Sequence, residues 1–577
     1  MTNPRARGSR RIWLPAGVFG LLALAISARL VQLQVIQHDH YATLTRQEQV
    51  SSSTSFARRG SILDRNGNVV ATSVDTWDVY VNKRAWTTPA KIQAASDSLA
   101  LLLKENAQNL RDTVANSESV DVLIKRDVEY EVGQQVLHQG ITGVIALPNT
   151  ARVNPEGDLG ASVIGFIGLD NNGLSGIEAS YDDVLQGTPG RAVYERDTTG
   201  DPIPFGQYIA SDPVPGKDVV LTIDRYLQQM AEAKLQAAVA AHQAKGGTIL
   251  IMDPMTMEIL ALATTPSFKY SDLPLETDDD LKLLKNTAVT DLYEPGSVMK
   301  VITAAAAIDK GVVTPNTTYY DSGEYTLYDT TLKNFDLAAW GTQTMTGVLQ
   351  HSINTGAIFM VNLLGRDVFQ KYLDAFGFGE ATGVDMNGEA VGIIRRPTDP
   401  GWSPVDLATQ SFGQSIGVTP LQMASAIAAA INGGRVITPH FVKAYIDADG
   451  NRQDVMPVVK SQVISPEASA TIRQMMSDVL TQTVPYPAKP KNYTGGGKSG
   501  TANVPIPNGS YDDRQIASYI GFAPLKSPKV LILVKLDENK DLQTGLVAAG
   551  PVFADLIDST LAYLNVAPDD GVLVRAP

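Results

Sequence analysis

The 577-residue sequence predicts an α+β protein that is divided into more than one domain. Apolar runs of strand length occur at residues 247–252 and 258–264, and such runs return at residues 516–522 and 530–535. Helical patterns lie between them, so we expect a sheet that joins segments far apart in the sequence and packs against helices. A chain of this length exceeds what one hydrophobic core usually serves, which predicts an accessory domain as well.

The composition excludes several classes of function. Acidic residues outnumber basic residues by 61 to 47, and a chain without a basic surplus is not expected to bind nucleic acid. The sequence contains no cysteine, which excludes disulfides, cysteine nucleophiles and thiolate metal sites. The glycines at residues 173–190 lack the strand–loop–helix context of a phosphate loop, and residues 447–450 match only part of a calcium loop. We therefore expect no metal and no cofactor.

The N-terminus has the pattern of a membrane anchor. The apolar run at residues 12–28 is at the short end of what spans a bilayer. The arginines that precede this run predict a cytoplasmic N-terminus and place the chain after about residue 37 outside the membrane: Arg5, Arg7, Arg10 and Arg11. A cleaved signal peptide is the alternative, because residues 25–27 resemble a cleavage site. The apolar periodicity continues through Leu30, Leu33 and Ile36, which favours an uncleaved anchor over residues 1–37.

Residues 38–215 are predicted to form a mixed accessory domain in which we find no motif for chemistry. Asn66-Gly67 lies between two apolar runs and predicts a type I′ hairpin turn. Residues 91–110 carry a helical pattern. The pattern changes near the prolines and the glycine of residues 213–216, where we place the boundary to the next domain.

The second domain is predicted to cover residues 216–568, followed by a short tail at residues 569–577. Asp224 is a suitable N-cap for an amphipathic helix that runs to about residue 244. The domain then carries the apolar strands at both of its ends and closes on a helix at residues 552–564.

The first candidate for chemistry is Ser297, in the segment Glu294-Pro295-Gly296-Ser297-Val298-Met299-Lys300. The alanine-rich run that follows is a strong helix former, so Ser297 is predicted at a helix N-terminus, where N–H groups and the helix dipole favour developing negative charge. Lys300 lies one turn further on the same face, and a desolvated lysine can serve as the base that a serine hydroxyl needs. Alone, this spacing recurs by chance and fits a capping serine beside a solvated lysine.

Two further motifs favour a catalytic role for Ser297 and Lys300 over a chance spacing. Ser352-Ile353-Asn354 follows, and Lys498-Ser499-Gly500-Thr501 comes after three glycines at residues 495–497. The order Ser-x-x-Lys, Ser-x-Asn and Lys-Ser/Thr-Gly is that of the catalytic elements in penicillin-binding proteins and class A β-lactamases. On an edge strand, the glycines before Lys498 are expected to let a substrate backbone approach closely. The ordered triple predicts an active-site serine enzyme.

Over nearly its whole length the sequence resembles the class B penicillin-binding proteins, nearer the septal, division-type branch. The resemblance implies a transpeptidase domain of the serine β-lactamase-like fold, an antiparallel sheet with flanking helices, behind an elongated pedestal domain and a transmembrane helix. Residues similar to the three family motifs of the pedestal are Arg59, Gly60, Asp64, Arg65 and Gly67 in the first, Arg152 and Pro155 in the second, and Gly176, Glu178 and Tyr181 in the third. Ser415 stands where glycine is usual in the family.

The resemblance also implies a role for each motif residue. Ser297 is the nucleophile that attacks the penultimate D-Ala of a stem pentapeptide and releases the terminal D-Ala, with Lys300 as its base. Ser352 relays a proton to the leaving amine, and Asn354 holds the substrate amide and Lys300. The residues that bind the substrate carboxylate are Lys498, Ser499, Gly500 and Thr501. The backbone N–H groups of Ser297 and Thr501 form the oxyanion hole, and an amine of a second stem peptide resolves the acyl-enzyme.

The implied ligands are peptidoglycan stem peptides and β-lactam antibiotics, and the implied partners are a polytopic membrane glycosyltransferase and other cell-division proteins. A D,D-carboxypeptidase or a β-lactam sensor shares the three motifs, and a non-catalytic division scaffold would need only the anchor and the pedestal. Hydrolytic β-lactamase turnover is not supported, because no glutamate between Asn354 and Lys498 stands in the expected context.

Two features imitate other catalytic sites. Gly413-x-Ser415-x-Gly417 matches the nucleophile elbow of α/β-hydrolases, but the next helix is predicted to begin late, at Thr419-Pro420, so we interpret the match as accidental. His351 lies beside Ser352, but adjacent residues rarely face each other and no carboxylate follows at a usable spacing. We interpret His351 as a structural histidine.

Overall fold

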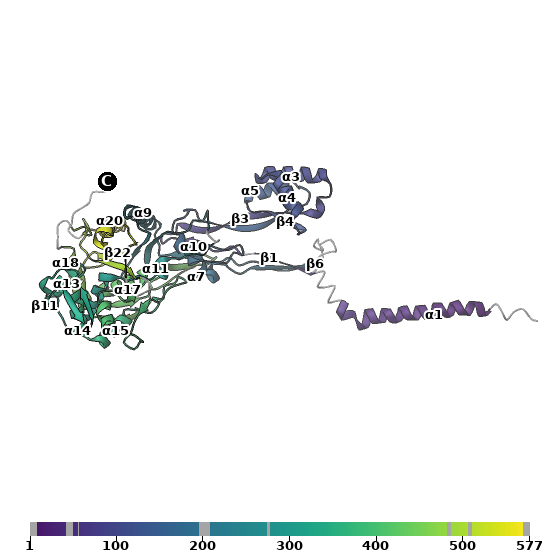
Figure 1. Cartoon of the computed structure of the whole chain (residues 1–577). Coiled ribbons are helices and arrows are strands. Elements are labelled where there is room, and N and C mark those ends of the chain that lie inside the picture. The colour runs from purple at the N-terminus through teal and green to yellow at the C-terminus, as the bar shows by residue number, and fades with distance from the viewer. Residues whose placement is uncertain are drawn as a thin grey trace, which may run out of the picture. The chain divides into compact units, whose positions relative to one another are not determined.

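The computed structural model describes residues 9–41, 50–55, 57–195, 208–273, 277–481, 486–505 and 511–568 (Figure 1). The chain divides into two compact units. The first consists of Met1–Arg58 and Gly187–Pro215, and the second of Arg59–Gln186 and Gly216–Pro577.

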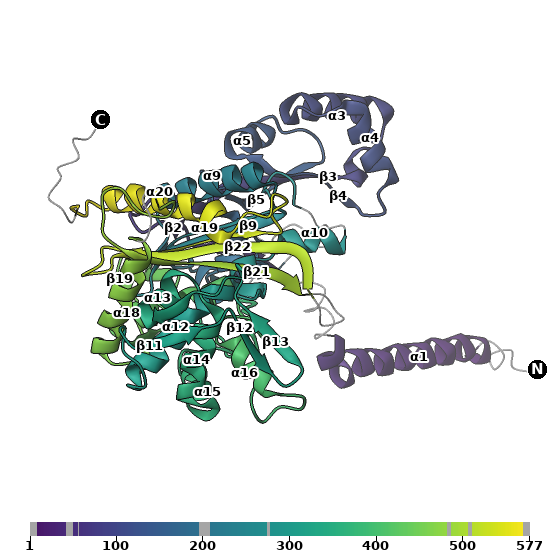
Figure 2. The ribbon, with the colours of Figure 1, turned by 60° about the vertical axis from the view of Figure 1, so that its left-hand side comes forward.

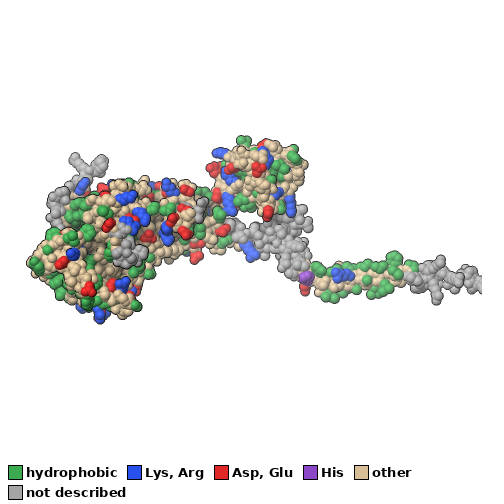
Figure 3. Space-filling model, viewed as in Figure 1, with side chains coloured by type: hydrophobic (Ala, Val, Ile, Leu, Met, Phe, Trp, Pro, Cys, Tyr) green, Lys and Arg blue, Asp and Glu red, His purple; other side chains and the backbone are tan. Residues whose placement is uncertain are grey.

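The first unit contains the N-terminal helix and a small antiparallel sheet. Helix α1 covers Ser9–Val31 and continues into a π-helical turn, η2, over Gln32–Ile36. Within this helix, Pro15–Ile36 form a 22-residue candidate membrane span with no buried residue, covered largely by hydrophobic side chains (Figure 3). A helix of this length is about 33 Å long, enough for a hydrocarbon core of about 30 Å. The sheet has the order β1-β6-β7, with bounds Val50–Ser55, Gly190–Glu195 and Tyr208–Ser211.

The N-terminal part of the second unit is built on a long strand that packs against a layer of helices. Strand β3, Val69–Asn82, pairs with β5, Val144–Val153, and with β4, Asp121–Glu129. Three helices share a core with these strands: α3 Pro89–Leu103, α4 Ala107–Asn116 and α5 Tyr130–His138. The helical pattern predicted at residues 91–110 forms two helices, because Lys104 takes a left-handed conformation with φ of 56° and Asn106 caps the second helix.

The predicted hairpin at Asn66-Gly67 is confirmed, but the predicted turn type is wrong. Strand β2, Ile62–Leu63, pairs with β3 across the turn. A type I′ turn needs positive φ at both central residues, and of Asn66 and Gly67 only Gly67 has one, at 86°. Asp64 determines the turn, because its Oδ1 accepts from the N–H groups of Asn66 (2.9 Å) and Asn68 (2.8 Å). Aspartate at the first turn position favours type I geometry.

One sheet joins early and late parts of the chain. Its order is β19-β18-β8-β2-β3-β4, with β5 paired to β3. The later strands are β8 Asp218–Leu221, β18 Val442–Ile446 and β19 Arg452–Asp454. Strands from both sides of the boundary predicted between residues 215 and 216 therefore share this sheet. The loop between β18 and β19 is a hairpin turn, in which the Asp447 carboxylate accepts from the N–H groups of Asp449 and Asn451.

The main sheet has five antiparallel strands in the order β10-β9-β23-β22-β21. Their bounds are β9 Gly246–Met252, β10 Ile259–Thr265, β21 Gly496–Pro505, β22 Tyr511–Ala523 and β23 Val530–Asp537. This order confirms that the apolar runs near residues 250 and 530 join in one sheet. The alternation of a strand sends Ile532 and Val534 of β23 into one core and Leu531 and Leu533 into the other.

Helices cover both faces of the main sheet (Figure 2). Helices α9, Arg225–His242, and α20, Gly550–Tyr563, lie on one face. The opposite face carries α12 Met299–Asp309, α17 Pro420–Ile431 and α18 Pro466–Val479. The predicted cap of α9 is confirmed, since Asp224 Oδ1 accepts from the N–H groups of Tyr226 (3.0 Å) and Leu227 (3.3 Å). A second apolar segment of membrane-spanning length, Gly545–Tyr563, is more than half buried in the core.

Short elements complete the second unit. The helices are η3 Lys83–Ala85, α6 Ala161–Ile164, α7 Gly176–Ser180, α8 Asp182–Leu185, α10 Asp278–Leu283, α11 Thr287–Thr290, η4 Gly296–Val298, α13 Met345–Gln350, α14 Asn354–Leu364, α15 Arg366–Ala375, α16 Pro404–Gln410 and α19 Gly545–Ala548. The strand pairs are β11 Thr318–Asp321 with β14 Gly341–Thr344, β12 Glu324–Leu327 with β13 Thr330–Lys333, β15 Ile393–Ile394 with β16 Ile416–Gly417, and β17 Arg435–Ile437 with β20 Val459–Gln462.

Candidate active site

Ser297 lies in the 3₁₀ turn η4, which leads directly into α12. The preceding backbone requires glycine, because φ of Gly296 is 56° and a Cβ there would lie 2.8 Å from the carbonyl oxygen of Thr501 on β21. The Gly296 N–H donates to the carbonyl of Gly413 at 3.0 Å. Ser297 therefore stands at a helix N-terminus, as the sequence predicted, and its segment packs against β21.

Lys300 is completely buried in α12, and its Nζ has three oxygen neighbours. It donates to Ser297 Oγ at 3.0 Å, to Ser352 Oγ at 3.3 Å and to the Ser352 carbonyl. Burial lowers the pKa of Lys300 well below its ordinary value, the positive charge of Lys498 lowers this pKa further, and Asp336 acts in the opposite direction. A buried lysine of this kind can be neutral and accept the proton of the neighbouring serine hydroxyl.

Ser352 lies between α13 and α14 and contacts two lysines. Its φ of 57° is in the left-handed region, which a residue with a side chain keeps only where the surroundings hold it. Lys498 on β21 is 2% exposed and donates to Ser352 Oγ and to the Ser499 carbonyl, both at 3.0 Å. Burial lowers the pKa of Lys498 to about 7. The Ser352 hydroxyl thus contacts the side-chain nitrogens of the first and third motifs, Lys300 Nζ and Lys498 Nζ.

Asn354 is the first residue of α14, and it is not among the partners of Lys300 within the described residues. Its Nδ2 donates instead to the carbonyl of Lys333 at the end of β13, at 2.8 Å. The expected hydrogen bond between Asn354 and Lys300 is therefore not formed among the described residues, where Lys300 donates to the Ser352 carbonyl. The other implied role, binding of the substrate amide, stays a prediction.

Ser499, Gly500 and Thr501 follow Lys498 on β21, which is an edge strand of the main sheet. These residues pair with β22 on one side, so their other side is available for an added strand. Thr501 Oγ1 accepts from the Gly545 N–H at 3.1 Å. A Cβ on Gly500 would lie 2.6 Å from the carbonyl oxygen of Pro295, which shows how closely β21 approaches the Ser297 segment.

The three glycines before Lys498 are required by packing within the domain. A Cβ on Gly496 would lie 2.8 Å from the Cβ of Met476 in α18, and a Cβ on Gly497 would lie 2.6 Å from the ring of Tyr519. A Cβ on Gly495 would lie 2.3 Å from the carbonyl oxygen of Phe522. The close approach of a helix and of β22 explains these glycines, so the approach of a substrate is not needed to explain them.

Glu294 is a residue to which the sequence reasoning gave no role. Its Oε1 accepts from the Ser415 N–H at 2.8 Å and from the Tyr511 hydroxyl at 3.2 Å, and burial raises the pKa of its carboxyl group. Ser415 has a φ of 56°, which explains why glycine is usual there in the family. The only sequence signal was a carboxylate three residues before the predicted nucleophile.

The two features that imitate other sites have structural explanations. Ser415 Oγ accepts from Thr409 Oγ1 at 3.0 Å, and the short strand β16 follows it, so no helix leaves the serine as an elbow requires. His351 stacks on Trp340 with ring centroids 3.9 Å apart. Both interpretations from the sequence agree with these contacts.

The pedestal motifs meet in one buried ionic cluster. Arg59 Nε donates to Glu178 Oε2 and Arg152 Nε to Glu178 Oε1, both at 2.7 Å. Arg59 also pairs with Asp182 at 2.6 Å. Glycines of the motifs lie against backbone: a Cβ on Gly60 would lie 2.0 Å from the Lys217 carbonyl oxygen, and a Cβ on Gly176 would lie 2.4 Å from the Val163 carbonyl oxygen. Outside this cluster, Arg65 of the first motif pairs with Glu258 at 3.3 Å.

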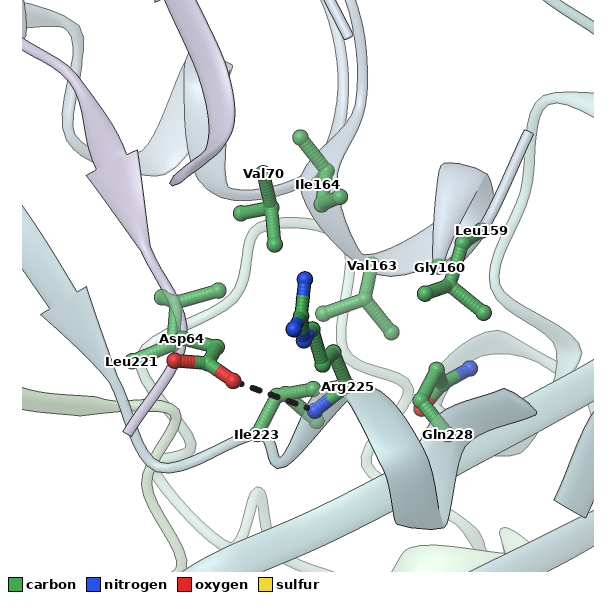
Figure 4. Close-up of a pocket in the computed structure, with 10 residues that line it drawn as sticks. All are labelled: Asp64, Val70, Leu159, Gly160, Val163, Ile164, Leu221, Ile223, Arg225 and Gln228. Atoms are coloured by element: carbon green, nitrogen blue, oxygen red, sulfur yellow. Dashed lines mark hydrogen bonds between the residues drawn. The ribbon is translucent and has the colours of Figure 1, made fainter. Parts of the chain in front are cut away.

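A small cavity lies beside Asp64 of the first pedestal motif, and no residue of the three catalytic motifs lines it (Figure 4). Its walls are mostly aliphatic, and the N–H of Arg225 donates to Asp64 Oδ2 at 3.4 Å beside it. The cavity measures about 10 Å³, room for about one water molecule. It is too small for a peptide, so it is not a candidate substrate site.

Comparisons with known proteins agree with this geometry. Residues 247–558 match the family model of the penicillin binding protein transpeptidase domain, and residues 54–221 match that of the penicillin-binding protein dimerisation domain. The chain is 32% identical over 559 residues to stage V sporulation protein D of Bacillus subtilis, which covers 96% of this chain and 85% of that protein. It is 30% identical over 567 residues to peptidoglycan D,D-transpeptidase FtsI of Escherichia coli, and this alignment covers 95% of this chain and 91% of that protein.

Solved structures show the same fold. The crystal structure of a peptidoglycan synthetase from Bifidobacterium adolescentis aligns with a TM-score of 0.73 at 26% identity, over 92% of this chain and 98% of that chain. Penicillin binding protein 2X from Streptococcus thermophilus aligns with a TM-score of 0.76 at 23% identity, over 91% of this chain and 82% of that chain. A transpeptidase domain behind a dimerisation domain, with relatives that match over almost the whole length, shows that this chain belongs to the class B penicillin-binding proteins.

Proposed function

We propose that Ser297 is the nucleophile of a membrane-anchored serine D,D-transpeptidase that cross-links peptidoglycan and is acylated by β-lactams. One observation carries the assignment. Lys300 is completely buried, its Nζ lies 3.0 Å from Ser297 Oγ, and Ser352 Oγ accepts from both Lys300 and Lys498. A nucleophile, a base with a lowered pKa and a hydroxyl that connects two lysines form the arrangement that acyl transfer to serine needs.

Acylation begins with a proton transfer from Ser297 Oγ to Lys300 Nζ. Ser297 Oγ then bonds to the carbonyl carbon of the penultimate D-Ala of a stem pentapeptide. The backbone N–H groups of Ser297 and Thr501 stabilise the oxyanion, and such donors are typically worth about 3 kcal/mol each. The close packing of Gly296 against Thr501 supports this pair, because it brings the two backbone segments together. The C–N bond to the terminal D-Ala breaks, Ser352 passes its proton to the leaving amine, and Ser352 takes in its place the proton that Lys300 received from Ser297.

The second half of the reaction restores the serine. An amine of a second stem peptide gives a proton to Lys300 as its nitrogen attacks the ester carbonyl. A new amide bond forms, the ester C–O bond breaks, and Ser297 Oγ leaves and takes that proton from Lys300 through the same contact. Lys498, Ser499 and Thr501 bind the terminal carboxylate of the donor peptide, with Gly500 allowing the close packing of the strand. Asn354 binds the substrate amide. An extended peptide that adds to the open side of β21 would receive its main-chain hydrogen bonds from this edge.

The remaining architecture supports a place at the membrane. The 22-residue span Pro15–Ile36 anchors the chain, with residues 1–37 as tail and anchor, residues 38–215 as pedestal, residues 216–568 as transpeptidase domain and residues 569–577 as a tail. The N-terminal arginines support an orientation with the N-terminus in the cytoplasm and the transpeptidase domain outside. A septal role follows the similarity to the FtsI protein of Escherichia coli. A polytopic membrane glycosyltransferase and other cell-division proteins are the proposed partners.

Labelling with a fluorescent penicillin tests the nucleophile. Wild-type protein is expected to form a covalent adduct that survives denaturing electrophoresis, and Ser297→Ala is expected to form none. Ser415→Ala is the matched control, because Ser415 imitates a nucleophile motif yet bonds to Thr409. Adduct on Ser297→Ala, or loss of adduct on Ser415→Ala, would show that the nucleophile is misassigned.

Mass spectrometry with a pentapeptide donor and an amine acceptor tests the fate of the acyl group. A cross-linked product is expected from the wild-type protein. Free tetrapeptide alone would identify a D,D-carboxypeptidase, and intact pentapeptide together with absent penicillin labelling would identify a non-catalytic scaffold.

A further inference from the structure

The turn that carries Ser352 is held by a residue outside the three motifs. Helix α14 begins at Asn354, and Ile353 before it has no side chain that caps a helix. The first N–H groups of a helix need acceptors. Asn334, just after β13, supplies one from elsewhere in the chain: its Oδ1 accepts from the N–H groups of Asn354 at 3.0 Å and Thr355 at 3.2 Å. We infer that Asn334 is a positioning residue that sets the place of Ser352 and thereby the rate of acylation, an inference that rests on the proposed function.

A buried carboxylate fixes the orientation of Asn334. Asp321 has no exposed surface, and its Oδ2 accepts from Asn334 Nδ2 and from the Trp340 N–H, both at 2.9 Å. Its Oδ1 accepts from the Gly323 N–H at 2.9 Å and from Thr355 Oγ1 at 2.6 Å. Rotating the amide of Asn334 by half a turn would set an acceptor against this carboxylate, so Oδ1 must face α14.

Two bonds join this network to the second motif. Asn334 accepts from the Asn354 N–H, and the carbonyl of its neighbour Lys333 accepts from Asn354 Nδ2 at 2.8 Å. Ser352 stands two residues earlier in a left-handed conformation, with its carbonyl and hydroxyl on Lys300. Since such a backbone conformation persists only where neighbours hold it, a shift in the start of α14 moves Ser352 away from both lysines.

The structure separates this role from general stability. Asn432 is a buried asparagine of similar exposure, 4% against 2% for Asn334, and its side chain makes three hydrogen bonds against four for Asn334. Its Nδ2 donates to the carbonyls of Pro254 and Arg435, and its Oδ1 accepts from the Arg435 N–H. None of these bonds reaches Ser352, so Asn432→Ala is a matched control for the loss of a buried amide.

The test compares acylation by a fluorescent penicillin in the full chain in detergent. Asn334→Ala is expected to lower the second-order acylation rate constant by at least about 10-fold, because small displacements of a reacting group slow such steps strongly. Asn432→Ala is expected to lower the melting temperature similarly but to change the rate less than about 2-fold. In a Ser352→Ala background, Asn334→Ala is expected to cost less than about 3-fold, because both changes then remove the same contact.

A second variant, Asn334→Asp, tests the inference through the pH dependence of acylation, which a merely structural role would not change. This variant also keeps the inference testable if Asn334→Ala does not fold. This variant keeps the acceptor for α14 but places a second carboxyl group against Asp321, so its rate relative to wild type should rise as pH falls and the pair takes up a proton. An unchanged rate in Asn334→Ala, an equal loss in the Ser352→Ala background, or a pH-independent ratio for Asn334→Asp would overturn the inference alone. Absence of labelling in the wild-type protein would overturn the proposed function as well.

Discussion

Replacing Glu178 with alanine removes the carboxylate that holds the pedestal motifs together. Glu178 is 1% exposed and bonds to two arginines, Arg59 and Arg152, whose side chains are 0% and 7% exposed. Without Glu178, two buried guanidinium groups lie close together. Among the described ion pairs, the remaining carboxylate, Asp182, is 25% exposed and pairs with Arg59 but not with Arg152. Removing one partner of a buried ion pair costs about 3–5 kcal/mol, and the loss of two such bonds places Glu178→Ala at the upper end, about 5 kcal/mol.

A scan of thermal unfolding in detergent measures this loss. For large domains 1 kcal/mol shifts the melting temperature by about 2 °C, so Glu178→Ala is expected to melt about 10 °C below wild type. Arg152→Ala is expected to lose less, because Arg59 and Glu178 remain paired. Glu538→Ala is the control: Glu538 pairs with Arg514 at 2.8 Å and with Lys245 at 3.3 Å, but its side chain is 21% exposed. Its pairs at the surface are worth below about 1 kcal/mol, or about 2 °C. A loss for Glu178→Ala no larger than that for Glu538→Ala would refute the reasoning.

Three further predictions concern the active site. The second-order rate constant of acylation should fall at low pH, where Lys300 with its lowered pKa becomes protonated. It should also fall as the pH rises past about 7, the pKa of Lys498, where that lysine loses its charge. A rate constant that does not change between pH 5 and 9 would contradict both assignments. Gly497→Ala should lose most acylation, because the added Cβ would lie 2.6 Å from the Tyr519 ring. Gly67→Ala has open space around the added Cβ but a φ of 86°, so it should keep acylation and cost only about 1 kcal/mol in the free energy of unfolding. Acylation that is lost in Gly67→Ala and kept in Gly497→Ala would contradict the packing described for both glycines. His351→Phe should keep the stack on Trp340 and acylate within about 3-fold of wild type, and a loss of about 100-fold would make His351 part of the chemistry.

Local relations in the sequence were predictable. Ser297 and Lys300 are three residues apart on one helix, so their contact follows from helix geometry. The cap at Asp224 and the strands of the main sheet follow in the same way from local patterns. The contact of Lys498 with Ser352 was predictable only because the family order of the motifs is known.

Relations that depend on tertiary contacts were not predictable. Glu178 joins Arg59 across 119 residues, and nothing in the spacing of charges indicates that pairing. Asn334 is one of many polar residues at the end of a strand, and its role appears only once α14 is known to start without a cap of its own. The Asn66-Gly67 pair alone predicts the wrong type of turn, because the type depends on the preceding Asp64, whose side chain accepts from N–H groups of the turn.

The strand order of the main sheet has a consequence for how the chain is made. β23 begins at Val530, in the last tenth of the sequence, yet it lies in the middle of the sheet between β9 and β22. A ribosome releases the N-terminal part first, so the edge of β9 that pairs with β23 stays unpaired while the 264 residues between β10 and β23 are synthesised. Until β23 is synthesised, Ser297, Lys300 and Ser352 are all present, but β21, against which the Ser297 segment packs, is not yet joined to β9 in one sheet. A chain that is cut before β23 is therefore expected to bind no antibiotic and to be handled by chaperones and proteases as an unfinished protein.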